Sequence, residues 1–178
     1  MKKLTAIVLA LTLLALTACG AEKKQDAEPA ESAQLANPWT DVNTAAEAAE
    51  GADVGSFELP DDGANTSAGA VNWTGYRWMR GLAQADGAIG SAELTVRKGF
   101  KADNGDISGD YNEYTNGWTV EVGDVIVYCY GNAEGKAMKA CWENGAYGYS
   151  LNIRGQGDEA DSYGVADDVI YALVALTK

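Results

Sequence analysis

Histidine is absent from this sequence of 178 residues. Its absence excludes Ser-His-Asp and Cys-His catalytic groups, zinc sites with histidine ligands and acid–base catalysis by imidazole. Carboxylate chemistry, lysine nucleophiles and Ser-Lys pairs are the enzyme mechanisms that remain. No spacing of residues in the sequence singles out one of these mechanisms, so we expect no catalytic residue and no enzyme activity.

Basic residues are also scarce, with 13 Lys and Arg against 26 Asp and Glu and a net charge of −13. This charge opposes binding to nucleic acid and to bare anionic lipid surfaces. An anionic ligand would require several cations to converge, and the simpler interpretation is that they balance an acidic surface in weak ion pairs. The cations in question are Arg77, Arg80, Arg97, Lys98, Lys101 and Arg154.

Long apolar runs are limited to the N-terminus, where the charge-free segment 5–18 follows Lys2 and Lys3. The segment is shorter than the roughly 20 residues that cross a bilayer, and its length is typical of a signal peptide. The segment ends in Leu-Thr-Ala-Cys, which has the form of a lipobox, so residues 1–18 are predicted to be a signal peptide and Cys19 to be lipidated. The alternative is an ordinary secretory signal with an incidental cysteine.

Residues 19–38 carry almost no large apolar side chain and are rich in alanine and charge. Such a segment cannot build a core, so we expect a lipidated cysteine followed by a disordered tether. Large apolar residues recur from Trp39, and residues 39–178 are predicted to form one extracytoplasmic domain. The covalent lipid would then hold this domain at the outer face of the cell membrane.

The periodicity within residues 39–178 predicts an α+β fold, in which a meander-like antiparallel sheet is packed by a short N-terminal helix and a C-terminal helix. The first helix is expected over 45–50, capped by Asn43 or Thr44 and ended by Gly51. The closing helix carries an apolar stripe at Ala166, Val169, Ile170, Leu173 and Leu176. Strands are expected at 56–59, 72–80, 92–97, 118–122, 125–130, 137–142 and 147–153, with loops at 81–90 and 103–112.

Cys129 and Cys141 lie on neighbouring predicted strands, and disulfides persist outside the cytoplasm. In an antiparallel hairpin, paired residues have a constant index sum, so the two cysteines share a face only if that sum is even. The apolar residues of both strands favour an even sum. A cross-strand disulfide and two buried thiols out of register both remain open.

The acidic segment 103–113 suggests calcium binding, because carboxylates, asparagine and glycine crowd together. The spacing does not fit an EF-hand loop: counted from Asp106, the sixth residue is Tyr111 rather than glycine, and the twelfth is Gly117 rather than glutamate. We favour a structural turn in which Asp106 and Asp110 accept hydrogen bonds from backbone amides. No metal and no other cofactor is expected.

Aromatic residues offer the most obvious ligand platform, since their rings can stack on sugars. In strands, however, alternating aromatics more often serve the core or cross-strand pairs. Trp142, Tyr147 and Tyr149 are assigned to structure. The candidate ligand contacts are Trp73, Tyr76, Trp78, Tyr111 and Tyr114.

Several motifs occur in a recognisable order after the lipobox and the acidic tether. They are Asn37-Pro38-Trp39, Phe57-x-Leu59-Pro60, the run Asp106–Asn112, and Trp142-x-x-Gly145 followed by Tyr147–Ser150. This order resembles a group of uncharacterised bacterial lipoproteins and is similar to domains attached to some anti-sigma-type membrane proteins. The segment 64–90 departs from the pattern by its length and its glycine content. The resemblance implies no catalytic residue.

Taken together, the sequence favours a lipoprotein that presents a non-catalytic binding or sensing domain at the cell envelope. Its partner would be an envelope protein, a wall component or a small ligand. The alternative is a carboxylate-dependent hydrolase acting on envelope glycans, because that chemistry needs two positioned acids and no histidine.

Overall fold

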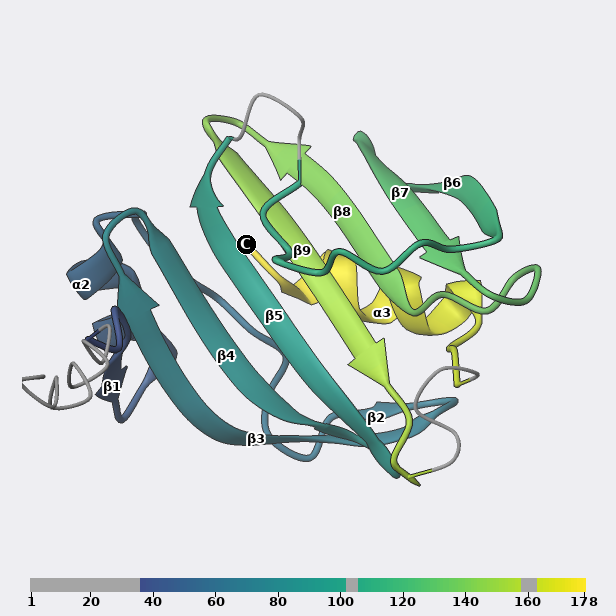
Figure 1. Ribbon diagram of the computed structural model, residues 1–178, viewed down its shortest axis with the longest axis horizontal. Coiled ribbons are helices and arrows are strands. Elements are labelled where there is room, and N and C mark those ends of the chain that lie inside the picture. Colours follow the sequence, from purple (N-terminus) through teal and green to yellow (C-terminus); the bar gives the residue numbers. More distant parts are fainter. Residues whose placement is uncertain (1–35, 102–105, 158–162) are drawn as a thin grey trace, which may run out of the picture. The chain divides into compact units, whose positions relative to one another are not determined.

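The computed structural model describes residues 36–101, 106–157 and 163–178, which belong almost entirely to the compact unit Asn37–Lys178. The described residues of this unit form an antiparallel sheet of nine strands with two helices (Figure 1). One helix is short and lies on the N-terminal side of the sequence, and the other ends the chain. The α+β fold expected from the sequence is confirmed.

The sheet consists of two meanders, β3-β4-β5 and β6-β7-β8-β9, which join where β5 pairs with β9. The full order is β1-β3-β4-β5-β9-β8-β7-β6, and β2 pairs with β3. The strands are β1 Thr40–Val42, β2 Asn65–Thr66, β3 Gly69–Met79, β4 Leu82–Ile89, β5 Ala92–Phe100, β6 Asn116–Val122, β7 Val125–Gly131, β8 Lys139–Asn144 and β9 Tyr147–Arg154.

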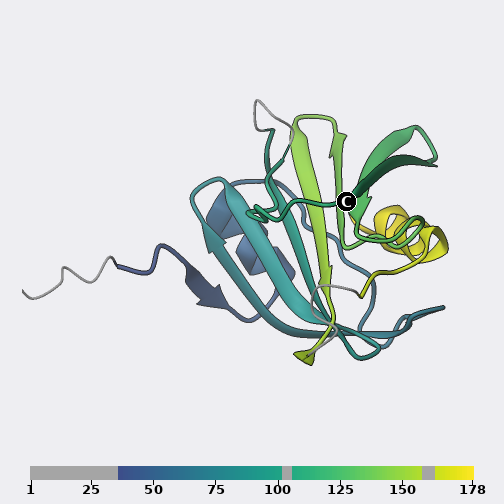
Figure 2. The same cartoon turned by 45° about the vertical axis from the view of Figure 1, so that its right-hand side comes forward.

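The two faces of the sheet differ sharply in polarity because successive side chains of a strand point to opposite faces. On one face, which we call the helical face, Val96 pairs with Leu151 and Leu94 with Ile153, and all four are buried. Both helices lie on this side (Figure 2). The other face, which we call the outer face, carries polar side chains.

Helix α2, Ala45–Ala52, begins at Thr44, whose Oγ1 accepts a hydrogen bond from the Glu47 amide at 3.1 Å. The helix continues past Gly51 to Ala52 and is capped by Asp53, which adopts the left-handed conformation, so the predicted end at Gly51 was wrong. Gly51 lies against the Trp78 ring, which a Cβ at this position would overlap. The close approach of helix and strand therefore requires the glycine inside the helix.

Helix α3, Asp167–Leu176, packs on the helical face through Val169, Ile170, Leu173 and Val174. The predicted stripe is correct at Val169, Ile170 and Leu173. It was wrong at both ends: Ala166 is the half-buried N-cap outside the helix, and Leu176 is 51% exposed while Val174 is buried instead. Asp167 at the first turn of the helix accepts a hydrogen bond from Trp118 Nε1 at 2.9 Å, which ties the helix to β6.

Two expectations about the first half of the chain were wrong. Residues 82–89, predicted as a loop, form the strand β4, which lies between β3 and β5. Residues 56–59, predicted as a strand, belong to no named strand, although Glu58 exchanges two backbone hydrogen bonds with Lys178, of 2.9 and 3.1 Å. The four strands predicted between residues 118 and 153 are confirmed as β6, β7, β8 and β9.

Candidate functional site

The outer face carries a row of polar side chains across the middle of the sheet. The pairing places Gln84 beside Arg97 and Asp86 beside Thr95 on β4 and β5, while Arg97 pairs with Ser150 and Thr95 with Asn152 on β9. Each of these residues occupies the position that alternates with a buried apolar neighbour on its strand. The polarity of the outer face therefore follows from strand alternation and register.

Residues 106–115, which we call the strap, cross the outer face over β9 and β8 (Figure 1). Ser108 is fully buried there, and its carbonyl oxygen accepts hydrogen bonds from Arg97 Nη1 and, at 3.2 Å, from Asn152 Nδ2. At the start of the strap, Asp106 Oδ2 binds Lys139 Nζ at 3.0 Å. Polar side chains of the sheet thus fix the strap in place.

The turns of the strap are held by its own side chains. Asp106 Oδ1 accepts a hydrogen bond from the Ser108 amide at 2.7 Å, and Asp110 Oδ1 accepts one from the Asn112 amide at 3.0 Å. These bonds confirm the predicted structural role of both aspartates. Asp103 and Asn104 lie outside the described residues. Within residues 36–101, 106–157 and 163–178, no group of three His, Cys, Asp or Glu side chains is placed to hold a metal ion.

Asp86 is the centre of a hydrogen-bond network on the outer face. Its carboxylate accepts bonds from Gln84 Nε2 at 2.8 and 2.9 Å, from Thr95 Oγ1 at 2.9 Å and from Arg77 Nη2 at 3.0 Å. Gln84 Oε1 in turn accepts a bond from Arg97 Nε at 2.7 Å. The network therefore runs without interruption from β3 to the strap.

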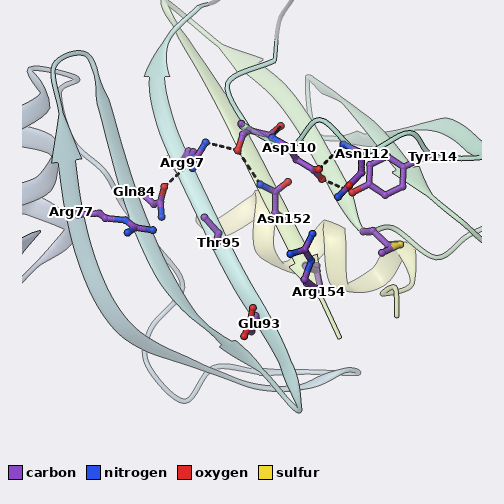
Figure 3. Close-up of a pocket in the computed structure, with 14 residues that line it drawn as sticks. Arg77, Gln84, Glu93, Thr95, Arg97, Asp110, Asn112, Tyr114, Asn152 and Arg154 are labelled. Carbon is purple, nitrogen blue, oxygen red and sulfur yellow. Dashed lines mark hydrogen bonds between the residues drawn. The ribbon is translucent and has the colours of Figure 1, made fainter. Parts of the chain in front are cut away.

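A cavity of about 250 Å³ lies between this network and the strap, and we call it the arginine pocket (Figure 3). Three of the four arginines in the sequence, Arg77, Arg97 and Arg154, line it. Figure 3 shows Arg77 on one side of Thr95 and Arg154 on the other. The remaining walls include Glu93, Asp110, Asn112, Tyr114 and Asn152.

Trp39 lies beside the pocket with its ring against two of these arginines. The guanidinium carbons of Arg77 and Arg97 are 5.1 and 5.6 Å from the ring centroid. Cation–π contacts at this distance favour a fixed position for the cations. Trp39 thus packs against two arginines that line the pocket.

The charged groups that hold the strap have shifted pKa values. Burial, together with the charge of Arg77, lowers the pKa of Arg97. Burial alone would raise the pKa of Asp106 and lower that of Lys139. The hydrogen bonds from Ser108 and Lys139 to Asp106 outweigh burial, so the pKa of Asp106 lies below and that of Lys139 above its usual value. The Asp106–Lys139 pair is therefore charged at neutral pH.

The other cations considered in the sequence do not join the pocket. Arg80 is exposed, and Lys101 binds Glu143 at 2.6 Å. Lys98 lies on the opposite, helical face, where it donates to the Ser56 carbonyl and lies 4.6 Å from the Tyr147 ring centroid. Of the cations considered in the sequence, those that line one common pocket are Arg77, Arg97 and Arg154.

Cys129 and Cys141 are both buried free thiols. The observed register pairs Cys129 with Ala140 and Tyr128 with Cys141, so the index sum is odd and the cysteines lie on opposite faces. The even register that a disulfide requires was the wrong expectation, because Val127 and Cys129, rather than Ile126 and Tyr128, point into the core. Burial raises the pKa of each thiol to about 12.

Of the candidate aromatic contacts, Tyr114 alone lines the arginine pocket. Trp73, Tyr76 and Trp78 are partly buried against the core, and Tyr111 on the strap is 95% exposed. Trp142 and Tyr149, assigned to structure, are buried and stacked with ring centroids 5.3 Å apart.

A second hollow of about 520 Å³ lies on the outer face of β7 and β8. Its lining includes the half-exposed Ile126 and Tyr128 together with Asp124 and Glu143. Its lining residue Asp106 is bonded by Lys139 and Cys141, and Glu143 pairs with Lys101. The network beside the arginine pocket, in contrast, links three strands and the strap in one series of bonds. The arginine pocket is therefore the better candidate site.

Sequence reasoning missed Gln84, Asp86 and Asn152 as members of a site. The first two lie in the stretch interpreted as a loop, where Ala83, Ala85 and Gly87 alternate with polar residues. That alternation was the available signal, but alanine and glycine are depleted in strands and therefore masked it.

Comparison with known proteins gives no further guidance, since no family model, no curated protein and no solved structure matches this chain. Among the described residues, no helix is long and apolar enough to cross a membrane. Cys19 lies outside the described residues.

Proposed function

We propose that this protein is a membrane-anchored lipoprotein, held by lipid on Cys19, that presents a non-catalytic binding domain at the cell envelope. The arginine pocket is its binding site, and a small polar molecule is its ligand. The observation that carries this proposal is the continuous network Arg77–Asp86–Gln84–Arg97–Ser108, which holds the pocket walls in place.

A fixed network favours binding because polar groups that are already ordered lose little entropy when a ligand arrives. Gln84 is 1% exposed and uses both ends of its amide, donating to Asp86 and accepting from Arg97. Gln84 therefore orients two charged neighbours at once. Such a supporting layer is typical of sites that must present polar groups in one geometry.

The pocket supports binding better than glycan hydrolysis. A carboxylate-dependent hydrolase needs two acids that face its substrate. Of the acids that line the pocket, Asp110 accepts hydrogen bonds from the Asn112 amide and the Tyr114 hydroxyl, so it shapes the strap. Its engagement favours a structural role for this carboxylate.

Blocking the pocket tests the proposal. Small polar molecules are screened by ligand-observed NMR against the full chain in detergent, and each hit is repeated with Thr95→Trp and Arg154→Trp, which fill the pocket from two sides. We expect hits whose binding both variants abolish. The matched control is Thr119→Trp, at an exposed outer-face position on β6 away from the pocket. Hits that survive both blocking variants, or a screen without hits, would refute the proposal.

A further inference from the structure

The charge of the arginine pocket is opposite to that of the protein. Its described lining contains Arg77, Arg97 and Arg154 against Glu93 and Asp110, a formal sum of +1 in a chain of net charge −13. Arginine presents a planar fork of donors that matches carboxylates and other oxyanions. Asp86 behind the lining already pairs with Arg77 at 3.0 Å, so a ligand with one negative charge suits the pocket better than a dianion.

The arginines differ in how many of their donors are already used. Arg97 donates to Gln84 and to the strap. Arg77 binds Asp86 through Nη2, but its buried Nε has no hydrogen-bond partner within the described residues. Arg154 is exposed and makes no ion pair in the part of the chain that the structure describes. Arg154 and Arg77 are therefore the arginines with capacity for a ligand.

The pocket also contains an acceptor without a donor. Asn152 Nδ2 donates to the Ser108 carbonyl, but its buried Oδ1 accepts no hydrogen bond from any described residue. A buried acceptor that stays unpaired costs free energy, and a donor on a ligand removes that cost. Glu93, exposed at the rim, is a second acceptor. The ligand should therefore carry hydroxyl groups in addition to its charge.

We infer that the arginine pocket takes a small monocarboxylate that carries hydroxyl groups, such as a sugar acid. This inference rests on the proposed binding function and names the ligand class for the same site. The carboxylate pairs with Arg154, a ligand oxygen accepts from Arg77 Nε, and the hydroxyls donate to Asn152 Oδ1 and Glu93. The volume of about 250 Å³ lies just below the range of about 300–1,000 Å³ for typical ligand pockets, so the pocket suits only a small molecule.

Isothermal titration calorimetry of the full chain in detergent tests the ligand class with four probes. D-gluconate has both features, D-glucose lacks the charge, hexanoate lacks the hydroxyls, and inorganic phosphate is an anion of higher charge. We expect gluconate to bind at least about tenfold more tightly than each of the others, because charge-assisted hydrogen bonds and a satisfied buried acceptor both contribute.

Two variants with the same change in net charge locate the carboxylate. Arg154→Gln should weaken gluconate binding at least about tenfold, as expected for loss of a charge-assisted pair. Arg80→Gln, which removes the arginine outside the pocket, should leave the affinity within about twofold. Both positions are exposed, so neither change threatens the fold.

The possible outcomes distinguish a wrong ligand class from a wrong binding function. If glucose, hexanoate or phosphate binds as tightly as gluconate and Thr95→Trp blocks that binding, the class is wrong and the binding function stands. If Arg80→Gln weakens gluconate as much as Arg154→Gln does, the attraction is a general charge effect and the inference fails. If no probe binds, the class is wrong, and the NMR screen of small polar molecules decides on the binding function.

Discussion

Arg97 and Lys139 fix the strap to the sheet from two different strands. Arg97 on β5 donates to the Ser108 carbonyl, and Lys139 on β8 binds the Asp106 carboxylate. Neither contact is recognisable in the sequence, because it depends on which outer-face positions the register brings beneath the strap. The sequence shows that these residues are present, but only the strand pairing shows that they lie close to the strap.

The Asp106–Lys139 pair should make the strap sensitive to acid. The pKa of Asp106 is lowered in the folded protein, so its contribution to stability is present above its unfolded pKa of about 3.9 and is lost as the pH falls through the folded value. The pKa of Lys139 is raised, so its contribution is complete below its unfolded pKa of about 10.4 and is lost as the pH rises through the folded value.

Thermal unfolding of the protein and of Asp106→Asn between pH 3 and pH 8 measures this contribution. We expect the wild-type protein to unfold at a higher temperature near neutral pH. The difference between the two proteins should begin to shrink as the pH falls below about 4, where the aspartate of the unfolded chain takes up a proton, and should be lost as the pH falls through the lower folded pKa. A difference that stays constant down to pH 3 would show that the charge of Asp106 does not hold the strap.

The strap, as an element, depends on a glycine at position 109. Gly109 has a φ of +63°, and a Cβ there would overlap Arg97 Nη1. The left-handed backbone disfavours a side chain here, and a Cβ would fit only if the Arg97 guanidinium moved away from its position against the strap. The sequence showed a turn-rich segment here, and its local hydrogen bonds were predicted correctly, but its position over β9 and β8 was not.

Gly109→Ala tests the strap against a matched control. Gly123 has nearly the same backbone, with a φ of +60°, but nothing lies within 4 Å of a Cβ at that position. We expect Gly123→Ala to cost about 1–2 kcal/mol in the free energy of unfolding, the cost of the left-handed conformation alone. Gly109→Ala should cost more, measured by urea unfolding, and should also weaken ligand binding. Equal costs with unchanged binding would contradict the contact with Arg97.

The fold class of the whole molecule could be predicted from the periodicity of its strands. The position of the site could not, because it depends on the register in which those strands pair. The four strands from 118 to 153 were predictable because β-branched and aromatic residues alternate there. Register was not predictable from these patterns: Ile126 and Tyr128 looked like core residues but are half exposed, and that error placed Cys129 and Cys141 on one face. The pocket could not be predicted either, because it includes residues of β4, and the alanines and glycine of that strand made it resemble a loop.

The proposed attachment to the membrane also concerns the whole molecule and is tested at Cys19. Cys19→Ser removes the sulfur that would carry the lipid, so we expect the protein to lose its acyl chains and to move out of the detergent-soluble membrane fraction. Intact-mass measurement and fractionation of cells that express each form report both effects. A protein that keeps its membrane association without acyl mass would contradict the lipid anchor.

Binding of a small hydroxylated carboxylate in the arginine pocket beside the strap is the central property proposed for this protein. Backbone amide NMR of the full chain in detergent, titrated with D-gluconate, tests it most directly. We predict shift changes concentrated at Thr95, Arg97, Ser108 and Asn152, with the helical-face residues Val127 and Ile170 unchanged. Saturating changes confined to the helical face, or no saturable change at all, would contradict it.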